Sequence, residues 1–195
     1  MAELTSTKNK VARHPKRRRV IFLDRDGVLN KDKGYLFKPN EFEFIDGVLT
    51  FLSKAQMRGY EFILITNQSG IGRGYFSEQD FLSLMTWVKR ELANRGLKIL
   101  DFFYCPHHPE FGIGKYKRNS FDRKPNPGMI LKAIKRYDID ETQAILIGDR
   151  SSDILAGTRA NVGRLYFLMS PEHKLEPRLR TICSEIKNFE AIGLN

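Results

Sequence analysis

Short apolar runs alternate with segments of helical periodicity between residues 20 and 168 of this 195-residue chain. The runs at 21–23, 61–66, 144–148 and 164–168 predict buried strands, and 102–105 predicts a shorter one. Apolar residues spaced three and four apart predict helices over 48–57, 81–92, 128–137 and 152–160. Because strands and helices alternate, we expect a three-layer, Rossmann-like α/β fold with a mostly parallel sheet covered on both faces.

Three segments lie outside this alternation. Residues 106–127 carry prolines, glycines and basic residues without a period, so we expect a long surface loop of the kind that tends to be functional. Beyond residue 170 the pattern is weaker, and it suggests a terminal helix around 179–186. We therefore expect a disordered basic tail over 1–19, one domain over 20–170, and an extension over 171–195 that packs on the domain or trails from it.

The composition is that of a globular protein, with 41% hydrophobic and 29% charged residues. No apolar run approaches the roughly 20 residues that a membrane-spanning helix requires. The net charge of +10 is concentrated at the start, because residues 1–19 hold seven lysines and arginines against Glu3 alone. A polar, basic start is not a secretory signal, so we expect a cytoplasmic protein whose tail either aids solubility or binds a polyanion. Cys105 and Cys183 are far apart, and we expect no structural disulfide.

Polar side chains follow three of the predicted strands. Asp24 and Asp26 come directly after 21–23, Thr66 and Asn67 end the strand at 61–66, and Asp149 follows 144–148. Because the carboxyl ends of parallel strands share one rim, these residues can meet in one crevice. Two acids spaced i, i+2 repel each other unless a cation or a shared proton intervenes. The pair therefore indicates Mg²⁺ or divided acid–base duty, with an ordinary acidic turn as the alternative.

Such a rim, together with a lysine, has the parts needed to handle a phosphate monoester. The phosphate dianion repels an attacking carboxylate, so its charge must be neutralised, which Mg²⁺ and a lysine would do. A covalent aspartyl-phosphate would divide a very slow displacement into two easier steps.

Four motifs occur in order along the chain: D-R-D-G at 24–27, T-N-Q at 66–68, Lys124 within R-K-P-N-P-G-M, and G-D-R-S-S-D at 148–153. Over residues 20–168 they resemble the four ordered motifs of the haloacid dehalogenase (HAD) superfamily of phosphatases. The strings D-K-G-Y at 32–35, F-I-D-G-V at 44–48, T-N-Q-S-G-I-G-R-G at 66–74 and Y-C-P-H-H-P at 104–109 resemble the D-glycero-D-manno-heptose 1,7-bisphosphate phosphatase branch. Histidinol-phosphate phosphatases are its nearest relatives. The intervals after the first two motifs are short, so we expect no separate cap domain.

The resemblance implies a role for each motif. Asp24 would attack phosphorus, and Asp26 would protonate the leaving oxygen and then deprotonate the hydrolytic water. Asp24, the Asp26 backbone carbonyl and Asp149 would hold Mg²⁺. Thr66 and Lys124 would bind the transferring phosphoryl group. In the last motif, Asp153 would either support the metal site without ligating it or serve only as an acid near the start of a helix.

Substrate-binding residues are expected around the same rim. Cations in the neighbouring loops suit a second, non-reacting phosphate because arginine forks pair with phosphate oxygens. The alternative is that these cations only solvate the surface. Tyr35 and Asn67 are candidates for contacting sugar hydroxyls between the two phosphates. The expected substrate-binding set is Asp32, Lys33, Gly34, Tyr35, Asn67, Gln68, Ser69, Arg73, Arg123 and Arg150.

One loop departs from the branch that the chain resembles. Relatives carry a zinc loop that begins C-x-H and closes with C-x-C just before the R-K pair. Here Cys105 and His107 are present, but Ser120 and Asp122 stand at the closing positions. Because serine is a poor zinc ligand, we expect no fully occupied structural zinc, although Asp122 or His108 could rescue a weak site. Packing must then hold the loop, and three aromatic residues are available for this: Phe111, Tyr116 and Phe121.

Three hypotheses of different kinds follow. The favoured one is a Mg²⁺-dependent phosphatase for a sugar bisphosphate, D,D-heptose 1,7-bisphosphate, in lipopolysaccharide precursor biosynthesis, with histidinol phosphate as the alternative substrate. A phosphatase for nucleic-acid 3′ ends is suggested by the basic tail, but the core lacks the interleaved aromatic and basic residues of a strand-binding groove. A non-catalytic binding protein on the same scaffold is disfavoured by the intact acidic residues and lysine. We expect a monomer with a small-molecule sugar phosphate as its partner.

Overall fold

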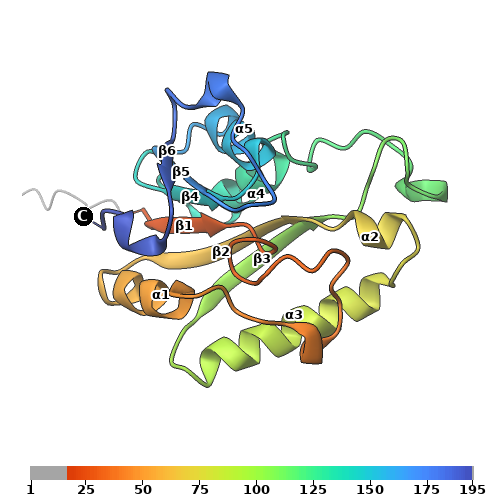
Figure 1. Cartoon of the computed structure of the whole chain (residues 1–195), viewed down its shortest axis with the longest axis horizontal. Coiled ribbons are helices and arrows are strands. Elements are labelled where there is room, and N and C mark those ends of the chain that lie inside the picture. The colour runs from red at the N-terminus through yellow and green to blue at the C-terminus, as the bar shows by residue number, and fades with distance from the viewer. Residues whose placement is uncertain (1–16, 195) are drawn as a thin grey trace, which may run out of the picture.

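The computed structural model describes residues 17–194, and these form a six-stranded sheet in the order β3-β2-β1-β4-β5-β6. Every pair of neighbouring strands is parallel (Figure 1). The strands are β1 (Val20–Leu23), β2 (Glu61–Asn67), β3 (Ile99–Cys105), β4 (Ile145–Gly148), β5 (Arg164–Leu168) and β6 (Ser184–Ile186). The predicted α/β architecture with a parallel sheet is confirmed.

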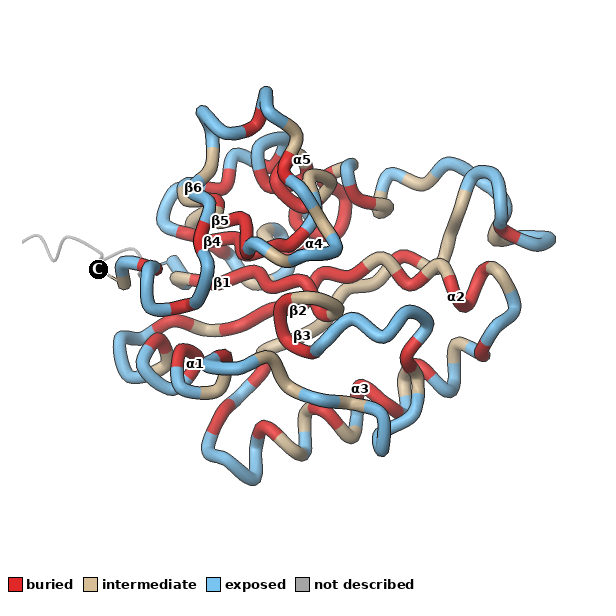
Figure 2. The backbone as a smooth tube through the Cα atoms, viewed as in Figure 1, coloured by how far each residue is buried: buried red, intermediate tan, exposed pale blue. Residues whose placement is uncertain are grey.

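Helices cover both faces of the sheet, so the described residues form three layers (Figure 1). One face packs against α1 (Val48–Met57) and α3 (Glu78–Ala93), and the other against α4 (Gly128–Tyr137) and α5 (Ser151–Arg159). Alternate residues of β1 point to opposite layers, so all four are fully buried (Figure 2). Each helix of the described part is too short or too polar to span a membrane.

The structure adds one helix that periodicity did not predict. The short α2 (Ser69–Gly72) follows β2 directly and turns the chain within the loop at 67–74. Short 3-10 turns complete the connections at Pro39–Glu41, Gly114–Tyr116, Pro177–Leu179 and Phe189–Ala191. The expected long loop at 106–127 is confirmed, and the turn at Gly114–Tyr116 is its one regular element.

The terminal helix expected around 179–186 is wrong. Ser184–Ile186 instead pair with β5 as the sixth parallel strand. The unpaired backbone groups at the edge of β5 form hydrogen bonds with this segment. These bonds depend on a strand that is not adjacent in sequence, so helical periodicity does not reveal them. Apolar residues beyond 170 are buried in both core layers: Leu175, Leu179, Ile186, Phe189 and Ile192.

The expected basic tail lies outside the described residues over 1–16. Its last residues, 17–19, are bonded to the domain. The Arg18 side chain donates to Glu61 at 2.6 and 2.8 Å, and its backbone N–H donates to Asp138. The Arg19 guanidinium donates to the Tyr60 hydroxyl at 2.6 Å. These contacts hold residues 17–19 against the domain next to the start of β1.

Candidate active site

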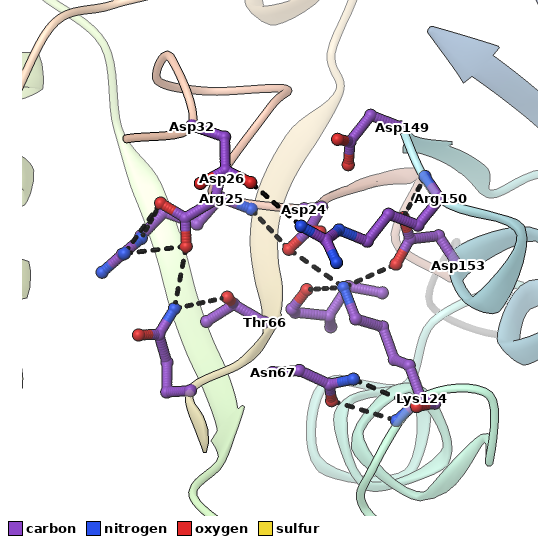
Figure 3. A network of polar contacts seen from close by, with 12 residues as sticks. Asp24, Arg25, Asp26, Asp32, Thr66, Asn67, Lys124, Asp149, Arg150 and Asp153 are labelled. Carbon is purple, nitrogen blue, oxygen red and sulfur yellow. Dashed lines mark hydrogen bonds and ion pairs between the residues drawn. The ribbon is translucent and has the colours of Figure 1, made fainter. Parts of the chain in front are cut away.

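Three buried carboxylates meet at the carboxyl ends of β1 and β4 (Figure 3). Asp24 follows β1, Asp149 follows β4, and Asp153 lies in the first turn of α5. One carboxylate oxygen of each lies within 4.8 Å of the others. Asp24 keeps its place because its backbone N–H donates to the Ile147 carbonyl at 3.1 Å, which extends the pairing of β1 with β4. The sheet order therefore brings together acids that are more than 120 positions apart.

Crowding of these acids perturbs their ionisation. Burial raises the pKa of Asp24 to about 7, and the nearby carboxylates of Asp153 and Asp26 reinforce the shift. Burial likewise raises the pKa of Asp149 to about 8, with further contributions from Asp24 and Asp153. Carboxylates that resist ionisation in this way call for a cation among them.

Lys124 supplies part of that positive charge. Its Nζ lies 2.9 Å from Oδ1 of Asp24 and 2.6 Å from Oδ1 of Asp153, and it donates to the Ile65 carbonyl at 2.9 Å. The side chain is only 2% exposed. Burial alone would lower the pKa of Lys124, but the two carboxylates outweigh it and hold that pKa above its ordinary value. The lysine is therefore a buried, charged group at the centre of the site.

Asn67 holds the backbone of Lys124 in place. Its amide accepts from the Lys124 backbone N–H at 3.1 Å and donates to the Lys124 carbonyl at 3.0 Å. Both the oxygen and the nitrogen of the Asn67 amide are thus engaged within the protein. Positioning of Lys124 is therefore a better role for Asn67 than the expected contact to a sugar hydroxyl.

Asp26 points away from the three buried carboxylates and toward three donors. The Arg25 guanidinium donates to both of its oxygens at 2.7 to 3.1 Å, and Asn30 donates at 3.0 Å. Gln68 donates to Asp26 at 3.1 Å and to the Thr66 hydroxyl at 2.8 Å. Asp26 is therefore fixed beside Thr66 without being part of the carboxylate cluster.

Arg25 was not among the site residues expected from the motifs. This arginine is fully buried, and its guanidinium also donates to the Leu36 carbonyl at 3.1 Å and faces the ring of Phe81 at 5.7 Å. Its place between two acids was the available signal, because a charged residue in a buried segment needs a partner.

A crevice of about 510 Å³ opens above these groups. Its walls contain nearly all the expected catalytic and substrate-binding residues, with Gly70, His108 and Ser152 in addition. The lining is Asp24, Asp26, Asp32, Gly34, Tyr35, Thr66, Asn67, Gln68, Ser69, Gly70, Arg73, His108, Arg123, Lys124, Arg150 and Ser152. Lys33 does not line it, because its Nζ lies 3.3 Å from the Glu43 carboxylate.

Three arginines give one side of the crevice a positive charge. Arg150 donates to Asp32 at 3.0 Å, and Arg123 donates to the His107 carbonyl at 3.1 Å. Arg73 lies over the ring of Phe111 at 4.4 Å. Burial lowers the pKa of Arg123, an effect that nearby Arg73 and Arg150 increase. Mutual repulsion of these guanidinium groups favours an anion between them.

The altered loop brings two of its candidate zinc ligands together and pairs a third with a lysine. The Cys105 Sγ lies 3.7 Å from Nδ1 of His107, but the Asp122 carboxylate is paired with Lys132. Burial raises the pKa of the Cys105 thiol, which opposes the thiolate that zinc requires. In the described part of the chain, the carboxylates of Asp24, Asp149 and Asp153 are the one group of three or more such side chains close enough to share a metal. A loop without zinc remains our prediction.

Backbone hydrogen bonds hold this loop. The Ile113 N–H donates to the Gly72 carbonyl at 2.8 Å, and the His108 N–H donates to the Tyr116 carbonyl at 3.1 Å. Tyr116 packs on the core, as expected. Phe111 and Phe121 are 55% and 62% exposed, so the expectation that they anchor the loop by burial is wrong. The loop contributes His108, Arg123 and Lys124 to the lining of the crevice, and two of its aromatic rings remain exposed.

The buried acids suit a magnesium ion. Mg²⁺ prefers oxygen ligands, and Oδ1 of Asp149 is buried without a hydrogen-bond partner among the described residues. Asp24 and Asp149 are the natural carboxylate ligands. Both oxygens of Asp153 are engaged, Oδ1 by Lys124 and Oδ2 by the Arg150 backbone N–H at 2.9 Å, whereas the Lys124 and Arg25 N–H contacts of Asp24 both fall on its Oδ1. The Asp26 carboxylate is turned toward Arg25, so any contribution from this residue would come from its backbone carbonyl.

Comparison with known proteins agrees with this chemistry. The sequence of residues 121–166 matches the HAD-hydrolase-like family. A D-glycero-alpha-D-manno-heptose-1,7-bisphosphate 7-phosphatase of Burkholderia mallei is 51% identical over 145 residues, which cover 74% of this chain and 77% of that protein. The corresponding beta-anomer enzyme of Pasteurella multocida is 48% identical over 74% of this chain and 78% of its own length.

A solved structure shows the same likeness. The D,D-heptose 1,7-bisphosphate phosphatase of B. bronchiseptica, complexed with magnesium and phosphate, superposes with a TM-score of 0.72 and 26% identity, covering 89% of this chain and 94% of that one. Given these identities over three quarters of both chains, this protein belongs to the D-glycero-D-manno-heptose-1,7-bisphosphate 7-phosphatase family of HAD-like hydrolases.

Proposed function

We propose that this protein is a Mg²⁺-dependent phosphatase that removes the 7-phosphate of D-glycero-D-manno-heptose 1,7-bisphosphate. The observation that carries the proposal is a single crevice lined by Asp24, Lys124 and three arginines, with Asp149 buried next to Asp24. The first group suits the phosphate that reacts, and the second suits a phosphate that does not. The names of the relatives support this substrate and this position of cleavage.

In the first step Asp24 attacks phosphorus. An Asp24 carboxylate oxygen forms the new P–O bond, and the bond from phosphorus to the sugar C7 oxygen breaks. Lys124, whose Nζ lies 2.9 Å from Asp24, together with the Thr66 hydroxyl, stabilises the charge on the transferring phosphoryl group. Asp26 donates a proton to the leaving sugar oxygen, so the sugar departs as an alcohol.

In the second step a water molecule cleaves the aspartyl-phosphate. Asp26, now a carboxylate, removes a proton from that water as its oxygen bonds to phosphorus. The bond to Asp24 breaks, the free carboxylate is restored, and inorganic phosphate leaves. The donors around Asp26 hold its carboxylate beside Thr66 when it acts as the base in this second step. Bound Mg²⁺, held by Asp24, Asp149 and the Asp26 carbonyl, would supply Lewis-acid charge for the phosphate oxygens.

The arginine side of the crevice accounts for the second phosphate. Arg73, Arg123 and Arg150 present guanidinium forks, which pair with phosphate oxygens more specifically than single ammonium groups do. Binding energy from the remote phosphate then positions the reacting one. A histidinol phosphate carries only one phosphate and would leave these arginines without a phosphate to bind. The small crevice suits a small sugar phosphate.

A phosphate-release screen tests the proposal. Both anomers of the heptose bisphosphate are compared with histidinol phosphate, p-nitrophenyl phosphate and 3′-phosphorylated DNA, each with and without Mg²⁺. We expect the highest kcat/KM on one heptose bisphosphate anomer, and no turnover in the Asp24→Asn variant. Higher kcat/KM on histidinol phosphate or DNA, or wild-type turnover by Asp24→Asn, would contradict the proposal.

A further inference from the structure

His173 lies beside the carboxylate cluster although no motif contains it. Its Nε2 is 3.5 Å from Oδ2 of Asp149 and 3.9 Å from Oδ2 of Asp32. This nitrogen is buried and has no hydrogen-bond partner among the described residues. A polar ring atom in that position is directed at acids on the rim of the site.

His173 belongs to a segment that crosses the end of the sheet, residues 170–176, which we call the strap. After β5, the Met169 N–H donates to the Ile186 carbonyl at 2.9 Å. At the other end Leu175 is buried and the Glu176 N–H donates to the Ser151 hydroxyl at 2.9 Å. Because both ends are held by the core of the domain, the imidazole has a defined position.

Asp149 differs from Asp24 and Asp153 because Lys124 does not contact its carboxylate. Lys124 contacts Asp24 and Asp153, whereas the nitrogen-bearing side chain found within 4 Å of Asp149 in the described part of the chain is His173. The backbone of Gly27 approaches the same carboxylate, because a Cβ added to Gly27 would lie only 2.1 Å from Oδ2. Gly27 and His173 therefore both restrict the position of this oxygen.

We propose that His173 is a positioning residue that holds Asp149 in the orientation required to bind a divalent cation. With its proton on Nε2, the ring donates toward Oδ2 and leaves Oδ1, which has no hydrogen-bond partner, to face the cation. Carboxylates that ligate metals are commonly oriented by such outer partners, and loss of one partner lowers metal affinity by about 10- to 100-fold. The inference rests on the proposed function, in which Asp149 is a metal ligand.

Three variants separate the imidazole N–H from the packing of the ring. His173→Phe keeps a ring but removes the donor, and His173→Gln keeps a donor at a similar reach. Lys174→Ala alters an exposed neighbour in the strap and is the matched control. Titration calorimetry with MgCl₂ on metal-free protein measures the affinity directly, without relying on turnover. His173→Ala provides a second donor-free variant if the phenylalanine prevents folding.

We expect the Kd for Mg²⁺ to rise about tenfold or more in His173→Phe and to stay within about threefold of wild type in His173→Gln and Lys174→Ala. At saturating Mg²⁺ the kcat of His173→Phe should approach the wild-type value, with the KM for substrate little changed. Equal Mg²⁺ affinity in wild type and His173→Phe would overturn the inference while leaving the proposed function intact. An equal loss of Mg²⁺ affinity in Lys174→Ala would overturn the inference too, because the effect would then come from any change in the strap and not from the imidazole. A wild-type protein that binds no Mg²⁺ would overturn both proposals.

Discussion

Replacing Lys124 with methionine tests the electrostatics of the site most directly. Methionine has a similar length but no charge, so the change leaves Asp24 and Asp153 without the cation that lies 2.9 and 2.6 Å from them. Removing one partner of a buried ion pair costs about 3–5 kcal/mol, because the remaining charge stays buried and unpaired. For a chain of this size each kcal/mol corresponds to about 2–4 °C, so we expect the Tm of the metal-free variant to fall by roughly 10 °C at pH 8.

The pH and the metal should both modify this loss. At pH 5 the crowded carboxylates can protonate, since the pKa of Asp24 is already raised to about 7 with the lysine present. The difference between wild type and Lys124→Met should therefore be smaller at pH 5 than at pH 8. Added Mg²⁺ replaces part of the missing charge and should recover part of the stability at pH 8.

Urea and thermal denaturation with EDTA or MgCl₂ measure these differences. Lys132→Met is the matched control, because Lys132 is also paired with an aspartate, Asp122, but its side chain is 60% exposed. Exposed pairs contribute only about 0–1 kcal/mol, so this variant should stay close to wild type. A loss below about 1 kcal/mol for Lys124→Met in EDTA at pH 8 would refute the reasoning. Turnover of Lys124→Met should fall by about 10²-fold or more, as a donor to the transferring phosphoryl group is lost.

Three further predictions concern the acids, the arginines and the altered loop. Since the pKa values of Asp24 and Asp149 are raised to about 7 and about 8, the folded metal-free protein retains protons that the unfolded chain releases above about pH 4. Its Tm in EDTA should therefore fall from pH 5 to pH 8, more steeply than that of Asp24→Asn, and a Tm that rises instead would contradict these shifts. Arg123→Ala should lower kcat/KM for the heptose bisphosphate by about 10- to 100-fold, and that for p-nitrophenyl phosphate far less, because a charge-assisted hydrogen bond is worth about 1.5–3 kcal/mol. Equal losses on both substrates would remove the case for a second phosphate site. Elemental analysis should find far less than one zinc per chain, and the double substitution Ser120→Cys with Asp122→Cys should raise this to about one; one equivalent in the wild type would show that the loop binds zinc as it stands.

Local patterns were sufficient for most of the scaffold. Apolar strands such as β1 and β2, and helices with one apolar face such as α3, are visible in the sequence because burial requires period two or uninterrupted apolar runs in strands and a period near 3.6 in helices. The alternation of these strands and helices along the chain was enough to predict the parallel sheet. Placement of Asp24 and Asp149 at one rim follows from that topology, so the sequence alone indicated both the carboxylates and their meeting point.

The partners of those residues were decided by the tertiary structure. No local pattern shows that the Arg25 guanidinium donates to the Leu36 carbonyl, that Lys33 pairs with Glu43 instead of lining the crevice, or that Asn67 is occupied by the Lys124 backbone. Each outcome depends on which of several competing partners lies within hydrogen-bond distance once the chain is folded. Such competition is settled by three-dimensional distances of a few ångströms.

The C-terminal part of the chain shows most clearly that local sequence patterns do not reveal contacts between distant segments. The periodicity around 179–186 suggested a helix, yet the segment pairs with β5 as β6, because the unpaired edge of a strand far away in sequence supplies the hydrogen bonds. The same course of the chain lays residues 170–176 across the end of the sheet and brings His173 to Asp149. The sequence determined which groups we propose for the chemistry, since those groups sit in motifs at strand ends. Only the folded chain decided which groups orient them, since that depends on contacts between segments with no pattern in common.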